Sequence, residues 1–351
     1  MNVQDVGLCG VTAMNYKWYL SDLKKVNKNG YKVFSCFSCG GGSSMGYKLA
    51  GFEVVGNCEI DPKTNEVYKT NHNPRYSFNM DIREFLKLDK YPKELYELDI
   101  LDGSPPCTSF STAGVREKGW GKQKVFAEGN KLQRLDDLFF PFIELAGKLK
   151  PKVIIAENVT GIVKGNAKGY VTEIINEYKK HGYITQIFKL NSATMGVPQK
   201  RERIFFVSYR NDLKFQKLKL QFNEKPILFG EYRSNIGKPI NKNTDTARLL
   251  NKRTKKDKKL ADIKTRLGEK YARYNAQIVH DDMVCPTITS GGEFYRFADA
   301  CKLSDLDIIL SQTFPLDYNF KDKRVQFICG MSVPPIMMAK LAEQVYLQWL
   351  K

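Results

Sequence analysis

The sequence predicts an α/β fold, with a doubly wound, mostly parallel sheet that helices cover on both faces, and a second, smaller domain. Between residues 31 and 210, short apolar runs alternate with amphipathic stretches, which is typical of strands that alternate with helices. Residues 211–283 are rich in lysine and hold few periodic apolar segments, and the regular pattern returns after residue 284. A chain of 351 residues is long enough for one large domain or two smaller ones.

The predicted strands are short runs of apolar and β-branched residues between turn residues. They are residues 31–37, 52–58, 98–101, 153–156, 184–190 and 204–209. Apolar residues at helical spacing predict helices between these strands and near the C-terminus. They are residues 43–49, 61–70, 135–149, 171–180, 303–311 and 335–350. Ligands of such sheets bind at the carboxyl ends of the strands, so the residues that follow each strand are the first candidates for a site.

The chain is strongly basic, with a formal net charge of +18 and a pI of about 9.4. A charge of this size attracts polyanions, among which nucleic acid comes first, although charge alone does not separate DNA from RNA or from an anionic membrane. Residues 252–259 carry six basic residues and one acid, Asp257, a local net charge of +5. This run is either a solvated loop or a face that contacts phosphates.

Other features of the sequence exclude several classes of protein. No apolar run approaches the ~20 residues of a membrane span, and the N-terminus lacks the pattern of a signal peptide, so we expect a cytoplasmic protein that binds no membrane. The eight cysteines are scattered, which favours reduced thiols over a disulfide framework. Cys36 and Cys39 form a CxxC pair without a second pair at zinc spacing, so we expect no metal site.

The ends of the first strands suggest a cofactor that contains adenosine. Gly40-Gly41-Gly42 follow the first strand, and glycines there let a ligand approach the backbone closely. Glu59 follows the second strand, where an acid can bind two ribose hydroxyls, and Ile60 beside it can pack on adenine. Asp61 can equally be a helix cap. Asp81-Ile82 follow another possible strand and can bind the amino group and ring face of adenine.

Three further motifs lie at predicted strand ends. Gly103-Ser104-Pro105-Pro106-Cys107 places a thiol after two rigid prolines, which fits a presented nucleophile better than a buried structural cysteine. Ala156-Glu157-Asn158-Val159 offers a carboxyl group for proton transfer, or simply a helix cap. Gln199-Lys200-Arg201-Glu202-Arg203 leads into a strand, so Arg201 and Arg203 can face one site and hold a phosphate or a base oxygen; alone, the run would be an ordinary basic surface.

In this order, the motifs resemble those of the cytosine-5 DNA methyltransferase family of bacterial and phage type. The late motifs of the family follow at Lys302-Leu303-Ser304-Asp305, at Gln312-Thr313-Phe314-Pro315 and at Gly330-Met331-Ser332-Val333-Pro334-Pro335. The resemblance covers about residues 31–210 and 284–350. It implies a sheet of the S-adenosylmethionine-dependent methyltransferase type and transfer of a methyl group from S-adenosylmethionine to carbon 5 of a cytosine flipped out of duplex DNA.

The resemblance also implies residue roles. Cys107 would add to carbon 6 of the cytosine, Glu157 would bond ring nitrogen 3 and the amino group, Arg203 would bind the ring carbonyl oxygen, and Arg201 would support a loop or bind a phosphate. Residues 108–134 would close over the flipped base. The expected cofactor residues are Phe37, Gly41, Gly42, Glu59, Ile60, Asp81, Ile82, Pro106 and Ser332. The expected substrate residues are Ser104, Pro105, Ser109, Ser111, Asn158, Gln199 and Thr289.

The family pattern predicts four segments. Residues 1–30 are an N-terminal extension, 31–210 the catalytic domain, 211–297 a target-recognition domain, and 298–351 a segment that returns to the catalytic domain. Three positions depart from the pattern: Ser35 stands where the family usually has Asp, Cys39 where it has Gly, and Met331 where it has Asn. The first and third could weaken hydrogen bonds to the cofactor, and Cys39 must adopt a backbone angle that favours glycine.

Two alternatives remain open on the sequence. The same chemistry could act on tRNA, since one branch of the family methylates RNA, or the chain could be a non-catalytic, DNA-binding regulatory homologue. A nicotinamide-dependent oxidoreductase would share the sheet but would not explain the Pro-Pro-Cys and Gln-x-Arg-x-Arg motifs. We expect a monomer that belongs to a restriction-modification system, with a cognate endonuclease as a functional partner, or an orphan or phage enzyme. The sequence does not reveal the recognition site.

Overall fold

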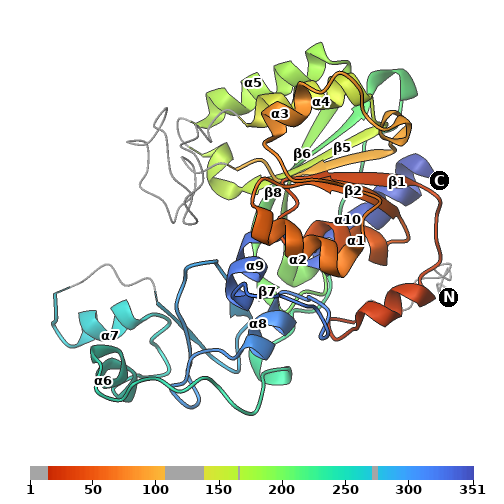
Figure 1. Cartoon of the computed structure of the whole chain (residues 1–351). Helices are drawn as coiled ribbons and strands as arrows, with labels where there is room; N and C mark the ends of the chain where they lie inside the picture. Colours follow the sequence, from red (N-terminus) through yellow and green to blue (C-terminus); the bar gives the residue numbers. More distant parts are fainter. Residues whose placement is uncertain (1–14, 107–137, 165–166, 271–275) are drawn as a thin grey trace, which may run out of the picture.

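The computed structural model describes residues 15–106, 138–164, 167–270 and 276–351. These residues form a larger lobe around a central sheet and a smaller lobe below it (Figure 1). The smaller lobe, here called the small lobe, comprises the described residues between 233 and 303. The mixed α/β fold that the alternating sequence pattern predicts is therefore confirmed.

Seven strands form the central sheet in the order β3-β2-β1-β4-β5-β8-β6. The first five are parallel, and β8 runs antiparallel to both of its neighbours. Their bounds are β1 Lys32–Cys36, β2 Glu53–Cys58, β3 Tyr76–Phe78, β4 Ile100–Gly103, β5 Val153–Val159, β6 Tyr183–Asn191 and β8 Glu202–Arg210. The strand order reverses between β1 and β4, and such a switch point opens a crevice for ligands at the carboxyl ends of the strands.

Helices cover both faces of the sheet, because successive residues of a buried strand point to opposite sides. Val33 packs with Tyr47 and Ile336 on one face, whereas its neighbour Phe34 packs with Phe142 on the other. The first face carries α1 Gly42–Leu49, α2 Pro62–His72 and α10 Pro335–Val345, and the second carries α3 Ile82–Leu86, α4 Phe139–Leu149 and α5 Ala167–Lys180 (Figure 1).

The C-terminal segment packs back onto the sheet, as its apolar spacing predicts. It contains α9 Val325–Met331, α10 and a π-helical turn over Tyr346–Leu350. By length and composition alone, Val325–Leu350 is apolar enough to cross a membrane. An apolar stretch of 18 residues within it is 72% buried inside the protein. The expectation that no apolar stretch approaches such a length is therefore wrong for this segment, whose apolar residues instead cover the sheet.

The small lobe has a compact core of its own although its sequence shows little periodicity. Its elements are short: α6 Asp245–Asn251, α7 Leu260–Arg266, β9 Gln277–Val279 and β11 Phe294–Arg296. Their apolar side chains form one cluster, comprising Leu249, Leu250, Leu260, Ile263, Ala276, Ile278 and Tyr295. Elements of three to seven residues contribute only one or two apolar positions each, so no sustained period is visible in the sequence.

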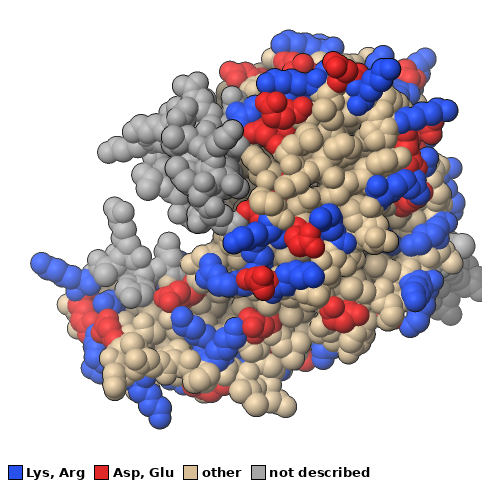
Figure 2. Space-filling model, viewed as in Figure 1, with Lys and Arg blue, Asp and Glu red and all other residues tan. Residues whose placement is uncertain are grey.

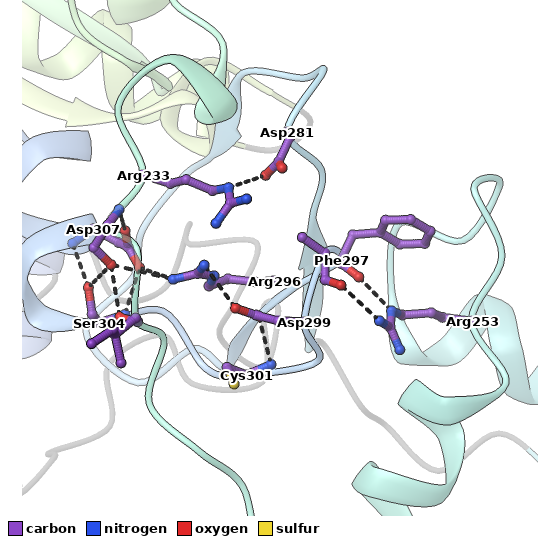
Figure 3. A network of polar contacts seen from close by, with 12 residues as sticks. Arg233, Arg253, Asp281, Arg296, Phe297, Asp299, Cys301, Ser304 and Asp307 are labelled. Carbon is purple, nitrogen blue, oxygen red and sulfur yellow. Dashed lines mark hydrogen bonds and ion pairs between the residues drawn. The ribbon is translucent and has the colours of Figure 1, made fainter.

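A buried polar network joins the small lobe to α8 Asp305–Ser311 (Figure 3). The side chain of Arg296, 1% exposed, forms ion pairs with Asp299 at 2.8 Å and with Asp307 at 3.6 Å. Asp307 also accepts hydrogen bonds from the backbone of Ser234, at 2.7 Å, and of Ser304, at 2.8 Å. A buried guanidinium is costly unless it is paired, so this network fixes how β11 sits on α8.

Residues that follow β8 remain on the sheet before the chain enters the small lobe. Leu218 is buried in the same cluster as α10. Its backbone N–H donates to Gln186 Oε1 of β6 at 2.8 Å, and Gln186 Nε2 donates back to its carbonyl at 3.1 Å. The lysine-rich region that begins at residue 211 therefore covers the outer part of the sheet first.

All six predicted strands are present, with ends that differ by a few residues. Strand β3 is the possible strand expected before Asp81, for which the sequence gave no bounds. The short helices α3, α6 and α7 and the two-residue pair of β7 Gln199–Lys200 with β10 Cys285–Pro286 were not predicted. Helix α8 begins at Asp305 rather than at residue 303, because the side chain of Ser304 accepts from Asp307 N at 3.0 Å and caps it.

Gly46 lies where α1 crosses α10, and a Cβ atom at this position would come within 2.5 Å of the carbonyl of Pro335. We expect Gly46→Ala to lower the free energy of unfolding by about 1–3 kcal/mol, because the helices must separate to admit the methyl group. Chemical denaturation measures this loss. The control is Gly169→Ala in α5, where nothing lies within 4 Å and the substitution should stabilise the helix slightly; equal effects of both variants would contradict the packing argument.

Candidate active site

Five segments meet at the carboxyl edge of the sheet, around the switch point between β1 and β4. Four follow the ends of parallel strands: the glycine turn after β1, Glu59 after β2, Pro105-Pro106 after β4, and Glu157-Asn158 at the end of β5. The fifth is the start of β8, because antiparallel pairing sets Arg203 opposite Val159. The sequence motifs that the resemblance singled out thus converge on one edge.

Glu157 and Arg203 form an ion pair at this edge. Arg203 Nε lies 2.8 Å from Glu157 Oε1, and the two side chains are 14% and 11% exposed. Glu157 Oε1 is buried and has no well-oriented hydrogen bond despite this ion pair, so it keeps capacity for a further donor. Two of the four predicted catalytic residues, Glu157 and Arg203, therefore lie together. Cys107, the predicted nucleophile, and the predicted substrate residues Ser109 and Ser111 lie outside the described residues.

Asn158 anchors the proline turn that precedes Cys107. Its Nδ2 donates to the carbonyl of Pro105 at 3.1 Å, and its Oδ1 accepts from Val159 N at 2.9 Å. Asn158 is 3% exposed, so the predicted direct contact with substrate is replaced by a positioning role. Pro105 is buried by this contact, while Ser104 and Pro106 are partly exposed and remain available to a ligand.

Gln199 and Arg201 are also buried, and both bind backbone rather than facing the site. Gln199 Oε1 accepts from Ile288 N at 3.0 Å, and Arg201 donates to the carbonyls of Ile288, at 3.2 Å, and Gly330, at 3.3 Å. These contacts agree with the alternative that Arg201 supports a loop, while the contacts of Gln199 with substrate and of Arg201 with a phosphate stay predictions.

The different directions of Arg201 and Arg203 have a simple geometric reason. Arg201 lies between β7 and β8, so the alternation of side chains along a single strand does not place it on the same side as Arg203. Burial lowers the pKa of the Arg201 guanidinium to about 9, which is the direction expected when a cation loses its water.

Thr289 lies in a tight turn that α9 holds in place. Gln326 Nε2 donates to the carbonyls of Thr289, at 3.0 Å, and Gly292, at 2.6 Å. Thr287 Oγ1 donates to the carbonyl of Lys200 at 2.7 Å, which ties the start of this turn to β7. The side chain of Thr289 is partly exposed, so it remains a candidate for contact with substrate.

The glycine turn adopts a left-handed backbone at three positions. Phe37, Cys39 and Gly41 have φ angles of 52°, 47° and 83°, so Cys39 does adopt the angle that its departure from glycine requires. The N–H of Cys39 donates to Glu59 Oε2 at 2.8 Å, which ties the turn to the end of β2. The Phe37 ring is partly buried, with its centroid 6.2 Å from that of Phe142.

Gly41 and Gly42 are required by close packing inside the protein. A Cβ atom on Gly41 would overlap the imidazole of His72, and one on Gly42 would overlap the carbonyl of Val333. Tyr318 donates a hydrogen bond to the carbonyl of Gly40 and lies 3.3 Å from His72 Nε2. Sequence reasoning assigned both glycines to the cofactor and missed His72 and Tyr318, because nothing in the sequence links these residues to the turn.

The two acidic positions of the predicted cofactor site differ in environment. Glu59 is 9% exposed and its carboxylate accepts from the backbone N–H groups of Cys39 and Asp61; burial raises its pKa. Asp81 is less buried, and its Oδ1 accepts from Arg83 N at 2.8 Å. Burial opposes ionisation of Asp81, but hydrogen bonds from Arg83 outweigh it and lower the pKa.

These residues fit a nucleoside. A carboxylate has about four acceptor sites, so Glu59 can accept two ribose hydroxyls in addition to its two backbone donors. Asp61 accepts from Thr64 N at 2.6 Å and caps α2, which confirms the alternative that the sequence left open for it. Ile60 is partly exposed, whereas Ile82 is 3% exposed and belongs to the core beneath α3.

The last of the late motifs, residues 330–335, lies against the glycine turn. Ser332 Oγ donates to the carbonyl of Ile328 at 2.8 Å, and a Cβ atom on Gly42 would lie 2.8 Å from the Ser332 Cβ. Ser332 is thus adjacent to the predicted cofactor site. Its neighbour Met331, which stands where the family usually has Asn, is 54% exposed.

The first of the three departures, Ser35, pairs with an acid that sequence reasoning did not single out. Ser35 and Asp102 are register partners on β1 and β4. Asp102 Oδ2 accepts from Ser35 Oγ at 2.7 Å, and Oδ1 accepts from Tyr47 OH at 3.2 Å. Burial raises the pKa of Asp102 to about 7, and the only sequence signal for it was its place at a strand end.

No group of three or more potential metal ligands occurs among the described residues. The six cysteines in the described part of the chain are all free.

The fold is of the S-adenosylmethionine-dependent methyltransferase type. The chain belongs to the C-5 cytosine-specific DNA methylase family, whose model matches residues 31–347. It is 33% identical to type II methyltransferase M.FnuDI of Fusobacterium nucleatum over 195 residues, which cover 54% of this chain and 50% of that protein. The chain thus spans about half the length of this relative.

Two other comparisons extend over most of the chain. Type II methyltransferase M1.HphI of Haemophilus parahaemolyticus is 26% identical over 335 residues, which cover 88% of this chain and 85% of that protein. The crystal structure of a prophage-encoded E. coli protein, described as a DNA modification methyltransferase, is 18% identical with a TM-score of 0.64, and the match covers 92% of this chain and 100% of that one. At this identity, the structural likeness supports the fold alone.

Asp102 gives the stability of the protein a specific dependence on pH. The Asp102 carboxyl binds its proton more tightly in the folded protein than in the unfolded chain. The contribution of protonated Asp102 to stability is therefore full at low pH and is lost as the pH rises from about 4 to about 7. We expect the difference in the free energy of unfolding between the wild type and Asp102→Asn to change by on the order of 1 kcal/mol per pH unit between these two pH values. Urea denaturation measures this difference. Parallel curves for the two proteins would contradict this account.

The two arginines should respond differently to substitution. We expect Arg201→Gln to lower the free energy of unfolding by about 3 kcal/mol, because the carbonyls of Ile288 and Gly330 lose a buried charged donor. Arg203→Gln should cost less, about 1–2 kcal/mol, because the glutamine amide can still donate to the largely buried Glu157 carboxylate, but it should impair methyl transfer strongly. Denaturation curves combined with turnover assays separate the two effects, and the opposite pattern would reverse the roles assigned here.

Proposed function

We propose that this protein is a DNA (cytosine-5-)-methyltransferase that uses S-adenosylmethionine. The observation that supports this most strongly is the Glu157–Arg203 ion pair, which lies beside the proline turn leading to Cys107. A carboxyl group and a guanidinium at this distance offer complementary hydrogen bonds to the edge of a pyrimidine base. Family membership and the type II methyltransferases among its relatives agree with the proposal.

The proposed cofactor site is the glycine turn with the ends of β2 and β3. Glu59 would bind the ribose hydroxyls, Asp81 the adenine amino group, and Ile60 with Phe37 the apolar faces. Gly41, Gly42, Ile82, Pro106 and Ser332 would complete the pocket, with Ile82 acting from the core beneath it. When bound, S-adenosylmethionine supplies an electrophilic methyl group.

The protein residues would prepare the base. Carbon 5 of cytosine is a poor nucleophile until a thiolate adds to carbon 6. Glu157, when protonated, would donate to ring nitrogen 3 and draw electron density from carbon 6, while Arg203 would bind the ring carbonyl oxygen. Cys107 would then add its thiolate to carbon 6, which makes carbon 5 nucleophilic. Because a base inside a duplex presents neither face, the cytosine must leave the helix first.

The other assignments follow from this chemistry. Duplex DNA is the proposed substrate, and Ser104, Thr289, Ser109 and Ser111 are the candidate contacts near the flipped base, the last two outside the described residues. Within the predicted segment 211–297, we assign target recognition to the small lobe, because the first residues of the segment, as far as Phe222, still pack against the sheet. We assign catalysis to residues 31–210 with the segment 298–351. The enzyme would act in the cytoplasm as a monomer, within a restriction-modification system or as an orphan methylase.

The decisive experiment measures transfer of tritiated methyl groups from S-adenosylmethionine to unmethylated duplex DNA and to bulk tRNA, followed by sequencing of the products at base resolution. The proposal expects 5-methylcytosine in DNA within a fixed sequence context. Incorporation into tRNA alone would move the substrate to RNA. Failure to modify either would favour a non-catalytic, DNA-binding role.

Replacement of Cys107 by serine should abolish methyl transfer, because a hydroxyl is far less nucleophilic than a thiolate near neutral pH. Affinity for DNA should change little, since the nucleophile contributes no phosphate contact. The matched control is Cys301→Ser, which alters a partly exposed, free cysteine of the small lobe and should keep wild-type turnover. Retained turnover in Cys107→Ser would remove this residue as the nucleophile.

A further inference from the structure

The run of basic residues 252–259 forms the connection between α6 and α7 in the small lobe (Figure 1). Five lysines on it are exposed, and none forms an ion pair with a carboxylate of the described residues. They are Lys252, Lys255, Lys256, Lys258 and Lys259. Lysine and arginine side chains project from the outer edge of the small lobe, at the lower left of Figure 2. The lysines therefore form a positive surface that the described protein does not neutralise.

The single acid of the run points inward. Asp257 is 3% exposed. Its Oδ2 accepts from the N–H of Thr254 at 2.6 Å, from Thr254 Oγ1 at 2.9 Å and from Arg266 Nη2 at 2.9 Å. These contacts close the loop against α7, so the exposed charges of residues 252–259 are all positive. On α7, the half-buried Asp262 accepts from the backbone N–H groups of Lys258, at 2.8 Å, and Lys259, at 2.9 Å. A solvated loop, the simpler interpretation of the sequence, would not bury its acid in this way.

The loop is also fixed to the rest of the small lobe. Arg253 Nε donates to the carbonyl of Phe297 at 2.6 Å (Figure 3), and Arg253 Nη1 donates to the carbonyl of Leu250 at 2.6 Å. The His280 ring stacks on Phe297 with centroids 4.3 Å apart, and His280 Nε2 lies 2.7 Å from the carbonyl of Asp257.

These contacts continue to the large lobe. Phe297 follows Arg296, which the buried network anchors to Asp307 of α8. The small lobe is also paired through β10 to β7, which leads directly to Arg203. The lysine loop is therefore built on a continuous set of contacts that begins beside the candidate active site.

We propose that the loop 252–259 is a preformed clamp for backbone phosphates of the DNA substrate, and that Asp257 is the positioning residue that holds its lysines in place. The proposal rests on the proposed function, since it assigns a surface to the same substrate. Lysine binds phosphate as a point charge and releases counterions from the duplex. A loop already ordered before binding avoids the entropy cost of ordering its backbone on the DNA.

The first test is salt-dependent binding of a short unmethylated duplex by the full chain. Each lost phosphate contact reduces the slope of log K against log salt by about 0.9, so Lys255→Gln combined with Lys256→Gln should reduce it by about 2 and weaken binding at low salt at least ~5-fold. The matched control is Lys214→Gln with Lys217→Gln. These exposed lysines follow the far end of β8, at the opposite edge of the sheet, and should leave the slope unchanged.

The second test distinguishes an ordered clamp from an unstructured loop that binds DNA through its net charge alone. Asp257→Asn removes one negative charge, so the net charge of the loop rises by one. An unstructured basic loop would therefore bind DNA more tightly after this substitution. The proposal expects weaker binding and a higher KM for DNA, with kcat at saturating DNA and affinity for S-adenosylmethionine unchanged. Asp282→Asn, at an exposed acid of the same lobe, makes the same charge change and should leave binding equal or slightly tighter.

The outcomes are distinct. An unchanged salt slope in the Lys255/Lys256 variant would overturn the clamp, and tighter binding by Asp257→Asn would overturn the positioning role of Asp257. Should Asp257→Asn unfold, the exposed lysine pair still tests the clamp. If the wild-type protein neither binds nor methylates duplex DNA, the proposed function itself fails, whereas normal methylation with unaffected lysine variants rejects only the clamp.

Discussion

The antiparallel pairing of β8 between β5 and β6 is the constraint on which the candidate site depends. In a sheet that was parallel throughout, the start of β8 would lie at the opposite edge from the end of β5, and Arg203 would be far from Glu157. The reversal brings the start of β8 to the carboxyl edge, next to the crevice between β1 and β4. The residues proposed to bind the cofactor and those proposed to bind the base can therefore share one edge.

Buried polar groups connect this edge to the rest of the protein. Arg201 and Gln199 form hydrogen bonds with the backbone of Ile288. Asn158 donates to the carbonyl of the proline turn, and Arg296 forms an ion pair with Asp307 of α8. Burying such groups is favourable only when partners satisfy them, so each fixes one loop in one position. The sequence motifs thus contain two kinds of residue. Some can contact a ligand, and others hold the ligand-contacting residues in position.

Much of the fold was predictable because the strands of the central sheet are short runs rich in apolar and β-branched residues, and the six longest of them were found. The order of motifs was equally informative about the site. The sequence did not show the direction of a side chain, as for Arg201, or a partner distant in sequence, as for Gly40 and Tyr318, which are 278 residues apart. Prediction failed in the small lobe, whose elements are too short to show a period.

The sequence by itself determined the fold class, the family resemblance and the residue types available at each strand end, because these depend on local patterns of hydrophobicity and on short motifs. The tertiary structure decided which of those residues share a site, which are buried as supports, and that the lone acid of a basic run is turned inward. Those outcomes depend on the register and direction of strands and on desolvation, which arise only when distant segments pack together.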